Sequence, residues 1–255
     1  MKIVVCVSGA FKADGENIDG GRRETDTVRN FKINRTNLIN AFSGADFYFS
    51  TWDTHEDAYR KVFGLEGLHI FPEPKIEYHP FIDVKNPLVN TPKFMKTVKH
   101  AKSDRVFWER SSKQTRQILA HAFSFETLSS DYDIVVRARH DTFVYKYANF
   151  TDLIYEAAKE SKAIGFATTK DYLKTFYTIH KMTGTEYSDQ FLFDQLIIHP
   201  KKIFDPHKVY ELHHDRELLP AEFGWYQVLS YPKNNHECYC GWVNPDKHVP
   251  KEYIK

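Results

Sequence analysis

Short apolar runs that end in turn-forming residues predict four strands along this chain. They cover residues 2–7, 46–50, 134–136 and 163–167, and they contain many β-branched and aromatic side chains. Runs of this kind without strict alternation are typical of strands buried on both faces of a parallel sheet. A fifth apolar run, over 188–198, fits a helix followed by a strand, and its periodicity does not separate the two.

Helical spacing of apolar residues connects these runs. Residues 25–42 predict a helix that Thr25 or Asp26 could cap, with an apolar face made of Val28, Phe31, Ile33, Leu38, Ile39 and Phe42. Residues 93–129 predict a helix in two pieces, of which the second is strongly apolar, and 150–161 predict a short one. Residues 71–92 contain five prolines and predict an irregular segment. A strand, a helix and a strand within the first 50 residues form a βαβ unit, so we expect an α/β fold.

Composition narrows the class of protein. At 255 residues the chain is long enough for one sizeable core, and we expect a single domain over 1–255 with a looser C-terminal third. No apolar stretch is long enough to cross a membrane, and residues 1–11 lack the pattern of a signal peptide. Three cysteines do not predict a disulfide framework, which favours a reducing, cytoplasmic location. A net charge of +1 argues against a protein that is basic throughout and coats nucleic acid.

Several common catalytic motifs are missing from the sequence. It contains no G-x-x-x-x-G-K-[ST], G-x-G-x-x-G, G-x-S-x-G, H-E-x-x-H or C-x-x-C pattern. These absences remove the direct sequence arguments for a P-loop nucleotidase, a dinucleotide-dependent dehydrogenase, a serine hydrolase and a zinc protease.

The most informative segment is the end of the third strand. Residues 134–141 read IVVRARHD, so strand alternation places Arg137, Arg139 and Asp141 on one face at the carboxyl end of a buried strand. Open α/β sheets bind ligands at that end. Two neighbouring guanidiniums favour an anion such as a diphosphate, and Asp141 could hold a divalent cation that bridges phosphates. The alternative is a structural cluster of arginines and carboxylates.

Two other strand ends reach the same edge of the predicted sheet. Residues 8–12 follow the first strand as SGAFK; Gly and Ala allow close approach of a ligand and Lys12 supplies a cation, although a plain turn also explains them. Residues 49–53 end the second strand as FSTWD. Trp52 could stack on a base or sugar and Asp53 could accept a hydrogen bond from a ribose, while the alternative is that Trp52 only caps the core.

In this order, SGAFK, FSTWD and IVVRARHD resemble segments of bacterial and viral glycosyltransferases of the polysaccharide-synthesis type. Those proteins have a GT-A-like nucleotide-diphospho-sugar transferase fold and carry V-R-x-R-x-D where other GT-A enzymes carry D-x-D. Residues 187–191 (YSDQF) and 221–222 (AE) are similar to two later segments of the same family, whereas 54–92 and the residues after 230 are not.

The resemblance implies a Rossmann-like, mixed and mostly parallel sheet flanked by helices, with a nucleotide-binding part over about 1–145 and an acceptor part over about 146–255. It implies a hexosyl- or pentosyltransferase that takes a nucleotide-diphosphate sugar, such as a UDP-sugar, and a glycan or other hydroxyl acceptor, with Mn²⁺ or Mg²⁺ as a cofactor. Arg139 occupies the place of the first acid of D-x-D, which puts the metal dependence in question. The residues implied to bind the nucleotide are Ser8, Gly9, Ala10, Phe11, Lys12, Thr51, Trp52, Asp53, Arg137 and Arg139, with Asp141 as the metal ligand.

Transfer to a hydroxyl needs a stabilised leaving group and, with inversion, a base. Asp189 is the candidate base, although a carboxylate before an apolar run is also a plain helix cap. Glu222 is a second candidate, for contact with the acceptor or the donor sugar.

A different class of function draws on residues 93–116, which carry eight cations and two acids with aromatic residues between them. This segment is either a solvated helix face or a surface for an acidic glycan, nucleic acid or membrane. The second option predicts a non-catalytic polyanion-binding domain, peripheral membrane contact, or a transferase that acts on modified nucleic acid. The groups 213–215 (HHD) and His236 with Cys238 and Cys240 are weak metal candidates, because neither shows a full ligand set.

Overall fold

The computed structural model describes residues 1–11, 28–78, 80, 105–142, 144, 149–167, 192–219, 221–230 and 236–240. Within these residues the strands are β1 (Ile3–Val7), β2 (Asp46–Trp52), β3 (Leu68–Phe71), β4 (Ile134–Ala138), β5 (Ala163–Ala167), β6 (Leu196–Pro200) and β7 (His236–Cys240). The helices are α1 (Val28–Ala41), α2 (Glu56–Phe63), α4 (Arg105–Glu126), α5 (Thr151–Glu160), α7 (Pro206–His214) and α8 (Ala221–Leu229), with 3-10 turns at Asp53–His55 and Lys201–Ile203.

All seven strands belong to one sheet, in the order β3-β2-β1-β4-β6-β5-β7. β1 pairs in parallel with β2 and β4, β2 with β3, and β5 with β7. β6 runs antiparallel to both of its neighbours, β4 and β5. The predicted mixed, mostly parallel sheet flanked by helices is therefore confirmed. Because β6 is reversed, its beginning lies at the edge where the parallel strands end.

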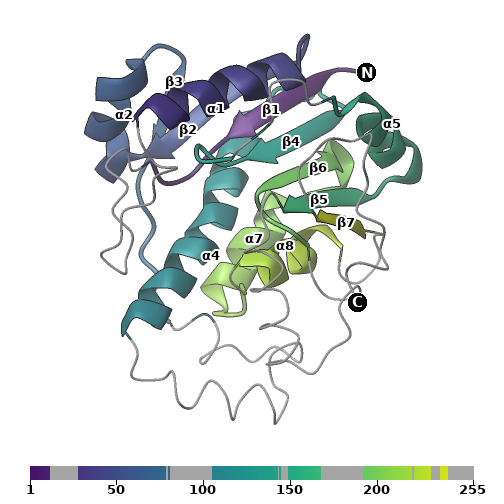
Figure 1. The fold of residues 1–255 in the computed structure, drawn as a ribbon. Helices are drawn as coiled ribbons and strands as arrows, with labels where there is room; N and C mark the ends of the chain where they lie inside the picture. The colour runs from purple at the N-terminus through teal and green to yellow at the C-terminus, as the bar shows by residue number, and fades with distance from the viewer. Residues whose placement is uncertain are drawn as a thin grey trace.

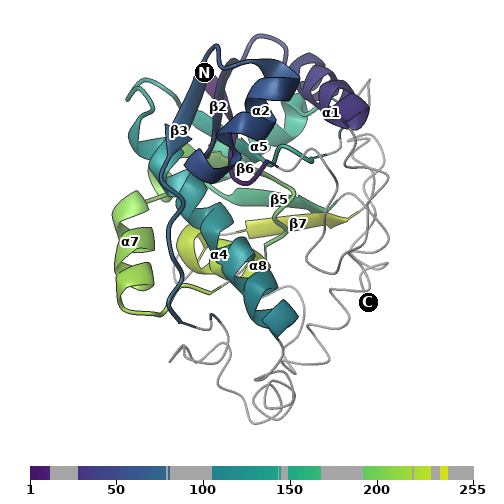
Figure 2. The ribbon, with the colours of Figure 1, turned by 90° about the vertical axis from the view of Figure 1, so that its left-hand side faces the viewer.

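Helices cover both faces of the sheet, and each face has its own hydrophobic core (Figures 1 and 2). On one face α4, α7 and α8 pack on strand residues such as Val4 and Val135. On the other face α1 and α5 pack on Val5 and Val136. Neighbouring residues of one strand thus point into different cores, which explains why the strands show no polar side in the sequence.

Two sequence-based expectations about local structure need correction. Ile33 and Ile39, predicted on the inner face of α1, are 41% and 40% exposed, whereas Asn34 is buried. β2 extends two residues beyond the prediction, so Trp52 lies inside the strand and not after it. The elements α2, β3, α7, α8 and β7 were not predicted, and α7 and α8 make the C-terminal third part of a core.

Among the described residues, no helix is long and apolar enough to span a bilayer. Cys6 is a buried free thiol on β1. Cys238 and Cys240 lie on β7, but their side chains are outside the described part of the chain.

Candidate functional site

Four segments meet at the carboxyl edge of the sheet. The first follows β1 (residues 8–11), the second is the end of β2 with the turn after it (51–53), and the third is the turn after β4 (139–142). The fourth (192–195) leads into the antiparallel strand β6. The first three coincide as the sequence predicts, because β2, β1 and β4 are parallel neighbours.

The segment after β1 turns away from the sheet at a glycine. Gly9 has φ +108°, a conformation that residues with a side chain rarely adopt. Apart from its two chain neighbours, no heavy atom of the described residues lies within 4 Å of the place of a Cβ. The main-chain nitrogen of Ser8 donates to the oxygen of Ala138 at 3.1 Å, which attaches the turn to β4. Its buried hydroxyl has no hydrogen-bond partner within the described part of the chain. Ala10 is exposed, Phe11 is buried among aromatic rings, and Lys12 lies outside the described residues.

The end of β2 supplies one exposed polar group. Thr51 is buried and its hydroxyl donates to the oxygen of Gly9 at 3.0 Å. Trp52 is 1% exposed and packs edge-on against Phe123 of α4. Its ring therefore caps the core, as the alternative held, and stacking on a base does not fit this position. Asp53 is exposed and accepts hydrogen bonds from the main-chain nitrogens of Thr54 and Glu73, at 2.8 and 3.0 Å.

Arg137 does not lie beside Arg139 at the edge. Its side chain is fully buried on the face covered by α4 and α8. Nη2 donates to Oε1 of Gln117 at 2.9 Å, Nη1 donates to the main-chain oxygen of Asp194, and the guanidinium lies 4.8 Å from the ring centroid of Trp225. The expectation that both arginines face one diphosphate is wrong, because β4 ends at Ala138 and strand alternation ends with it.

Arg139 and Asp141 form a bidentate ion pair. Nε donates to one carboxylate oxygen at 2.7 Å and Nη2 donates to the other. The two side chains are 21% and 28% exposed, so solvent reaches both. The described residues hold no cluster of three or more acids, histidines or cysteines that could hold a metal ion. The carboxylate that was predicted to bind metal therefore fills the guanidinium fork.

Sequence reasoning missed Asp194, which the structure brings to the same guanidinium. Its carboxylate lies 3.7 Å from Nη1 of Arg139 and its side chain is 2% exposed. A signal was available: Asp194 is the one acid in the apolar run 191–198, and a buried carboxylate is costly unless it is paired. The position at the edge could not be read from the sequence, because it depends on the reversed direction of β6.

Other predicted site residues are less fully described. Asp189 lies outside the described residues, and Glu222 lies in the first turn of α8 but its side chain is outside them. His213 and His214 end α7, where His214 pairs with Asp215 and makes no metal cluster in the described part of the chain. Of the basic segment 93–116, Arg116 pairs with Glu73 at 3.2 Å, while residues 93–104 lie outside the described residues.

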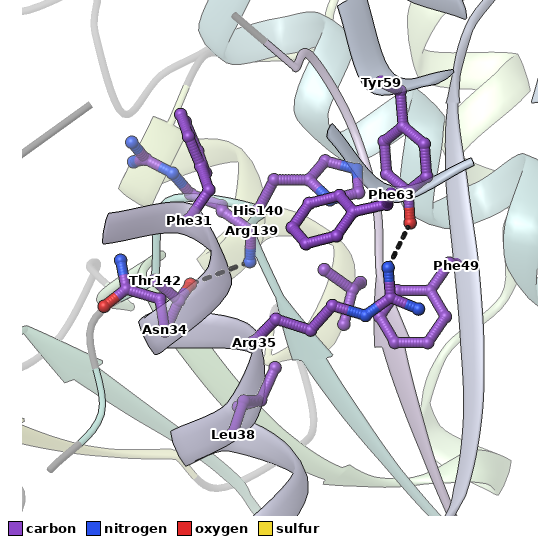
Figure 3. A pocket seen from close by; sticks show the side chains of 11 residues that line it. Phe31, Asn34, Arg35, Leu38, Phe49, Tyr59, Phe63, Arg139, His140 and Thr142 are labelled. Carbon is purple, nitrogen blue, oxygen red and sulfur yellow. Dashed lines mark hydrogen bonds between the residues drawn. The ribbon is translucent and has the colours of Figure 1, made fainter. Parts of the chain in front are cut away.

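A cavity of about 10 Å³ lies beneath the edge site, between α1, α2 and the turn after β4 (Figure 3). It has room for roughly one water molecule and is too small for a nucleotide. Arg35 lies in its wall, 3.9 Å from the ring centroid of Phe49 and 4.6 Å from that of Phe63, and donates to the hydroxyl of Tyr59 at 3.1 Å. This arginine therefore stabilises the packing of α1 on β2 and α2.

A larger cavity of about 360 Å³ lies at the opposite edge, beside the start of β1, the end of α1 and the start of α5. None of the sequence-predicted site residues lines it. The chemistry predicted from the sequence thus gathers at the carboxyl edge.

Comparisons with known proteins find no matching family model and no similar curated protein. Among solved structures, the chain is similar to 4-diphosphocytidyl-2C-methyl-D-erythritol synthase from Anaerococcus prevotii, with a TM-score of 0.45 and 12% identity over 99% of this chain and 92% of that one. It is also similar to Rv0371c from Mycobacterium tuberculosis, with a TM-score of 0.42 and 9% identity over 94% and 87%. For mouse xyloside xylosyltransferase 1 the TM-score is 0.39, with 8% identity over 90% and 80%.

Proposed function

We propose that this protein is a nucleotide-sugar-dependent glycosyltransferase that moves a sugar from a nucleoside diphosphate to a hydroxyl group of a glycan or another acceptor. The observation that carries the proposal is the Arg139 guanidinium, which presents its fork at the carboxyl edge of the sheet and holds a carboxylate there. Carboxylate and phosphate are the two groups that match this fork. Asp141 therefore marks the position that a phosphate of the donor would take.

The surroundings of Arg139 suit a nucleotide. The space over Gly9 is open, so a ligand can approach the main chain there. Ser8 offers a buried hydroxyl beside it, and Asp53 offers an exposed carboxylate for a ribose or base on the neighbouring strand end. Lys12 and Ala10 complete this pocket in the proposal. Arg137 and Trp52 support it from inside the core.

A diphosphate would compete with Asp141 for the fork of Arg139. Once displaced, the Asp141 carboxylate would be the residue to hold Mn²⁺ or Mg²⁺, which would supply positive charge beside the phosphates. In this step the guanidinium exchanges one anion for another, so it never lacks a partner. The proposal thus gives the two residues separate roles in the loaded state.

The transfer itself needs little else from the protein. The acceptor oxygen forms a bond to the anomeric carbon while the bond to the diphosphate breaks, and the nucleoside diphosphate leaves with the electron pair. Arg139 stabilises that leaving group, and a cation held by Asp141 would add positive charge there. In an inverting reaction the acceptor proton goes to a carboxylate, for which Asp189 remains our candidate; Glu222 is proposed to contact the acceptor or donor sugar. The cytoplasmic location expected from the cysteines is part of the same proposal.

Isothermal titration with UDP, GDP, ADP and CDP, each with and without Mn²⁺, tests the proposal. We expect one nucleotide to bind, and Arg139→Ala to weaken its binding by roughly 10- to 150-fold, as the loss of a charged hydrogen bond implies. Arg60→Ala is the matched control, because Arg60 is exposed on α2. The proposal fails if no nucleotide binds, or if Arg139→Ala and Arg60→Ala bind it equally well.

A further inference from the structure

His140 lies between Arg139 and Asp141 in the sequence. Its side chain reaches β2, a strand that does not pair with β4. Its side chain is 8% exposed, and Nε2 lies 2.8 Å from the main-chain oxygen of Ser50 in β2. Because a carbonyl oxygen only accepts, Nε2 carries the proton and donates it. β1 separates β2 from β4 in the sheet. The imidazole therefore crosses the end of β1, which turns away at Gly9.

The hydrogen bond of His140 closes a ring of three contacts around the edge. The nitrogen of Ser8 joins the end of β1 to β4 through Ala138, at 3.1 Å. The hydroxyl of Thr51 joins β2 to the turn after β1 through Gly9, at 3.0 Å. The imidazole of His140 joins the turn after β4 back to β2. Each of the three segments predicted from the sequence is thus attached to the other two.

Aromatic packing fixes the imidazole in this direction. The ring of His140 meets that of Phe11 edge-on, at 5.5 Å between centroids and an angle of 89°. It meets the ring of Tyr59 at 5.4 Å and 71°. Figure 3 shows His140 near Tyr59, on the side of the cavity away from Leu38. These contacts leave the side chain in the position that its hydrogen bond requires.

The same turn is attached on its other side to the segment before β6. The nitrogen of Arg139 donates to Oγ1 of Thr142 at 2.8 Å, and the nitrogen of Thr142 donates to the oxygen of Arg139 at 3.1 Å. The Thr142 hydroxyl donates in turn to the oxygen of Gln195 at 2.6 Å. The turn is therefore held between β2 and β6, and His140 supplies the attachment to β2.

We propose that His140 is a positioning residue: through its bond to Ser50 it holds the turn that presents Arg139 and Asp141 at the edge of the sheet. The claim that this turn serves a nucleotide rests on the function proposed above, whereas the claim that His140 orders the turn does not.

Two variants separate the hydrogen bond from the ring. His140→Phe keeps an aromatic ring and removes the donor, whereas His140→Gln keeps a donor near Nε2 and removes the ring. His69→Phe is the matched control, because His69 is an exposed histidine on β3. In each variant, NMR hydrogen exchange of the Arg139 and Thr142 main-chain amides measures the order of the turn, with Val135 and Val136 of β4 as internal references. Titration with whichever of UDP, GDP, ADP and CDP binds to wild type measures the effect on ligand binding.

We expect His140→Phe to speed exchange at Arg139 and Thr142 roughly five- to tenfold over the β4 references, as the loss of one hydrogen bond implies. We expect it to weaken binding of the nucleoside diphosphate by a similar factor. His140→Gln should keep most of the protection, and His69→Phe all of it. Unchanged exchange at these two amides in a folded His140→Phe protein would overturn the inference. If His140→Phe does not fold, loss of their protection in His140→Gln would overturn it. If wild type binds none of UDP, GDP, ADP and CDP but the exchange results hold, only the proposed function fails. If wild type and His140→Phe bind the same nucleotide equally, only the positioning role fails.

Discussion

The carboxylate of Asp194 lies 3.7 Å from Nη1 of Arg139, although the two residues are far apart in the chain. Arg139 is thereby placed between a buried acid and the half-buried carboxylate of Asp141. Both acids contact this one guanidinium. A diphosphate would bring further negative charge to it, and a divalent cation held by Asp141 would offset part of that charge.

Asp194→Asn tests the support of Arg139 by a buried charge. The amide keeps the shape of the side chain and removes its charge, so we expect the guanidinium to be less well oriented. Nucleoside diphosphate binding should weaken by roughly tenfold, the lower range for a charged contact. Titration calorimetry measures this, with thermal melting as a check on folding. Unchanged affinity would show that Asp194 does not support the site.

Metal removal tests the charge argument. With EDTA, we expect nucleoside diphosphate affinity to fall at least tenfold relative to Mn²⁺ or Mg²⁺, because the metal ion supplies the missing positive charge. Asp141→Asn should lose this metal dependence while Asp152→Asn, at the exposed start of α5, keeps it. Equal affinity with and without metal would contradict this account of the site.

Two buried histidines on the α4 side of the sheet predict an acid-sensitive fold. Nε2 of His121 lies 3.2 Å from Nε2 of His199, and both rings are fully buried. Nδ1 of His199 donates to the oxygen of Pro200, so its Nε2 accepts from His121. Burial lowers the pKa of His199 to about 4, and burial, then His199 and Arg137, hold the pKa of His121 well below its usual range.

The stability carried by these neutral rings is present above the unfolded pKa of about 6.5 and is lost as the pH falls toward 4. For His199 we expect a loss of about 3 kcal/mol in the free energy of unfolding over this range, since each pKa unit is worth about 1.4 kcal/mol. Urea unfolding from pH 7.5 to 4.5 measures it. His199→Gln should reduce the slope without abolishing it, because the pKa of His121 and that of His140 are also lowered. An identical slope would contradict the prediction.

Gly224 of α8 predicts a strong effect on stability. A Cβ at this position would lie 2.2 Å from the main-chain oxygen of Leu219 and 2.3 Å from Cδ1 of Ile118. Gly224→Ala must therefore push α8 away from α4, at a cost of roughly 1–3 kcal/mol. The midpoint of urea unfolding measures this, with the exposed substitution Tyr155→Ala as a control. An unchanged midpoint would mean that the two helices pack less closely.

The strands were predictable because they are buried on both faces, which leaves uninterrupted apolar runs such as 3–7 and 134–136. Their edge was predictable because β1, β2 and β4 are parallel neighbours. The directions of side chains near strand ends were harder to predict from the sequence. Arg137 is buried and Arg139 is not, because β4 ends between them. The inner face of α1 was predicted wrongly because Arg35 packs inward against Phe49 and Phe63, where the pattern placed apolar residues.

Asp194 shows what local patterns leave out. Its place in the site follows from β6 running antiparallel between two strands that it joins, which is a long-range property. An acid within an apolar run indicated a paired carboxylate but gave no partner. The ring of hydrogen bonds through His140 depends in the same way on three segments that meet only in the folded chain.

Mass spectrometry of the products from a panel of nucleotide sugars tests the central claim most directly. The wild-type chain and Arg139→Ala are each incubated with UDP-, GDP-, ADP- and CDP-linked sugars, Mn²⁺ and a mixture of glycan acceptors. We predict that wild type releases the nucleotide from at least one donor, with the sugar joined to an acceptor or to water, and that Arg139→Ala loses most of this activity. No turnover of any donor, or equal turnover by both proteins, would contradict the account.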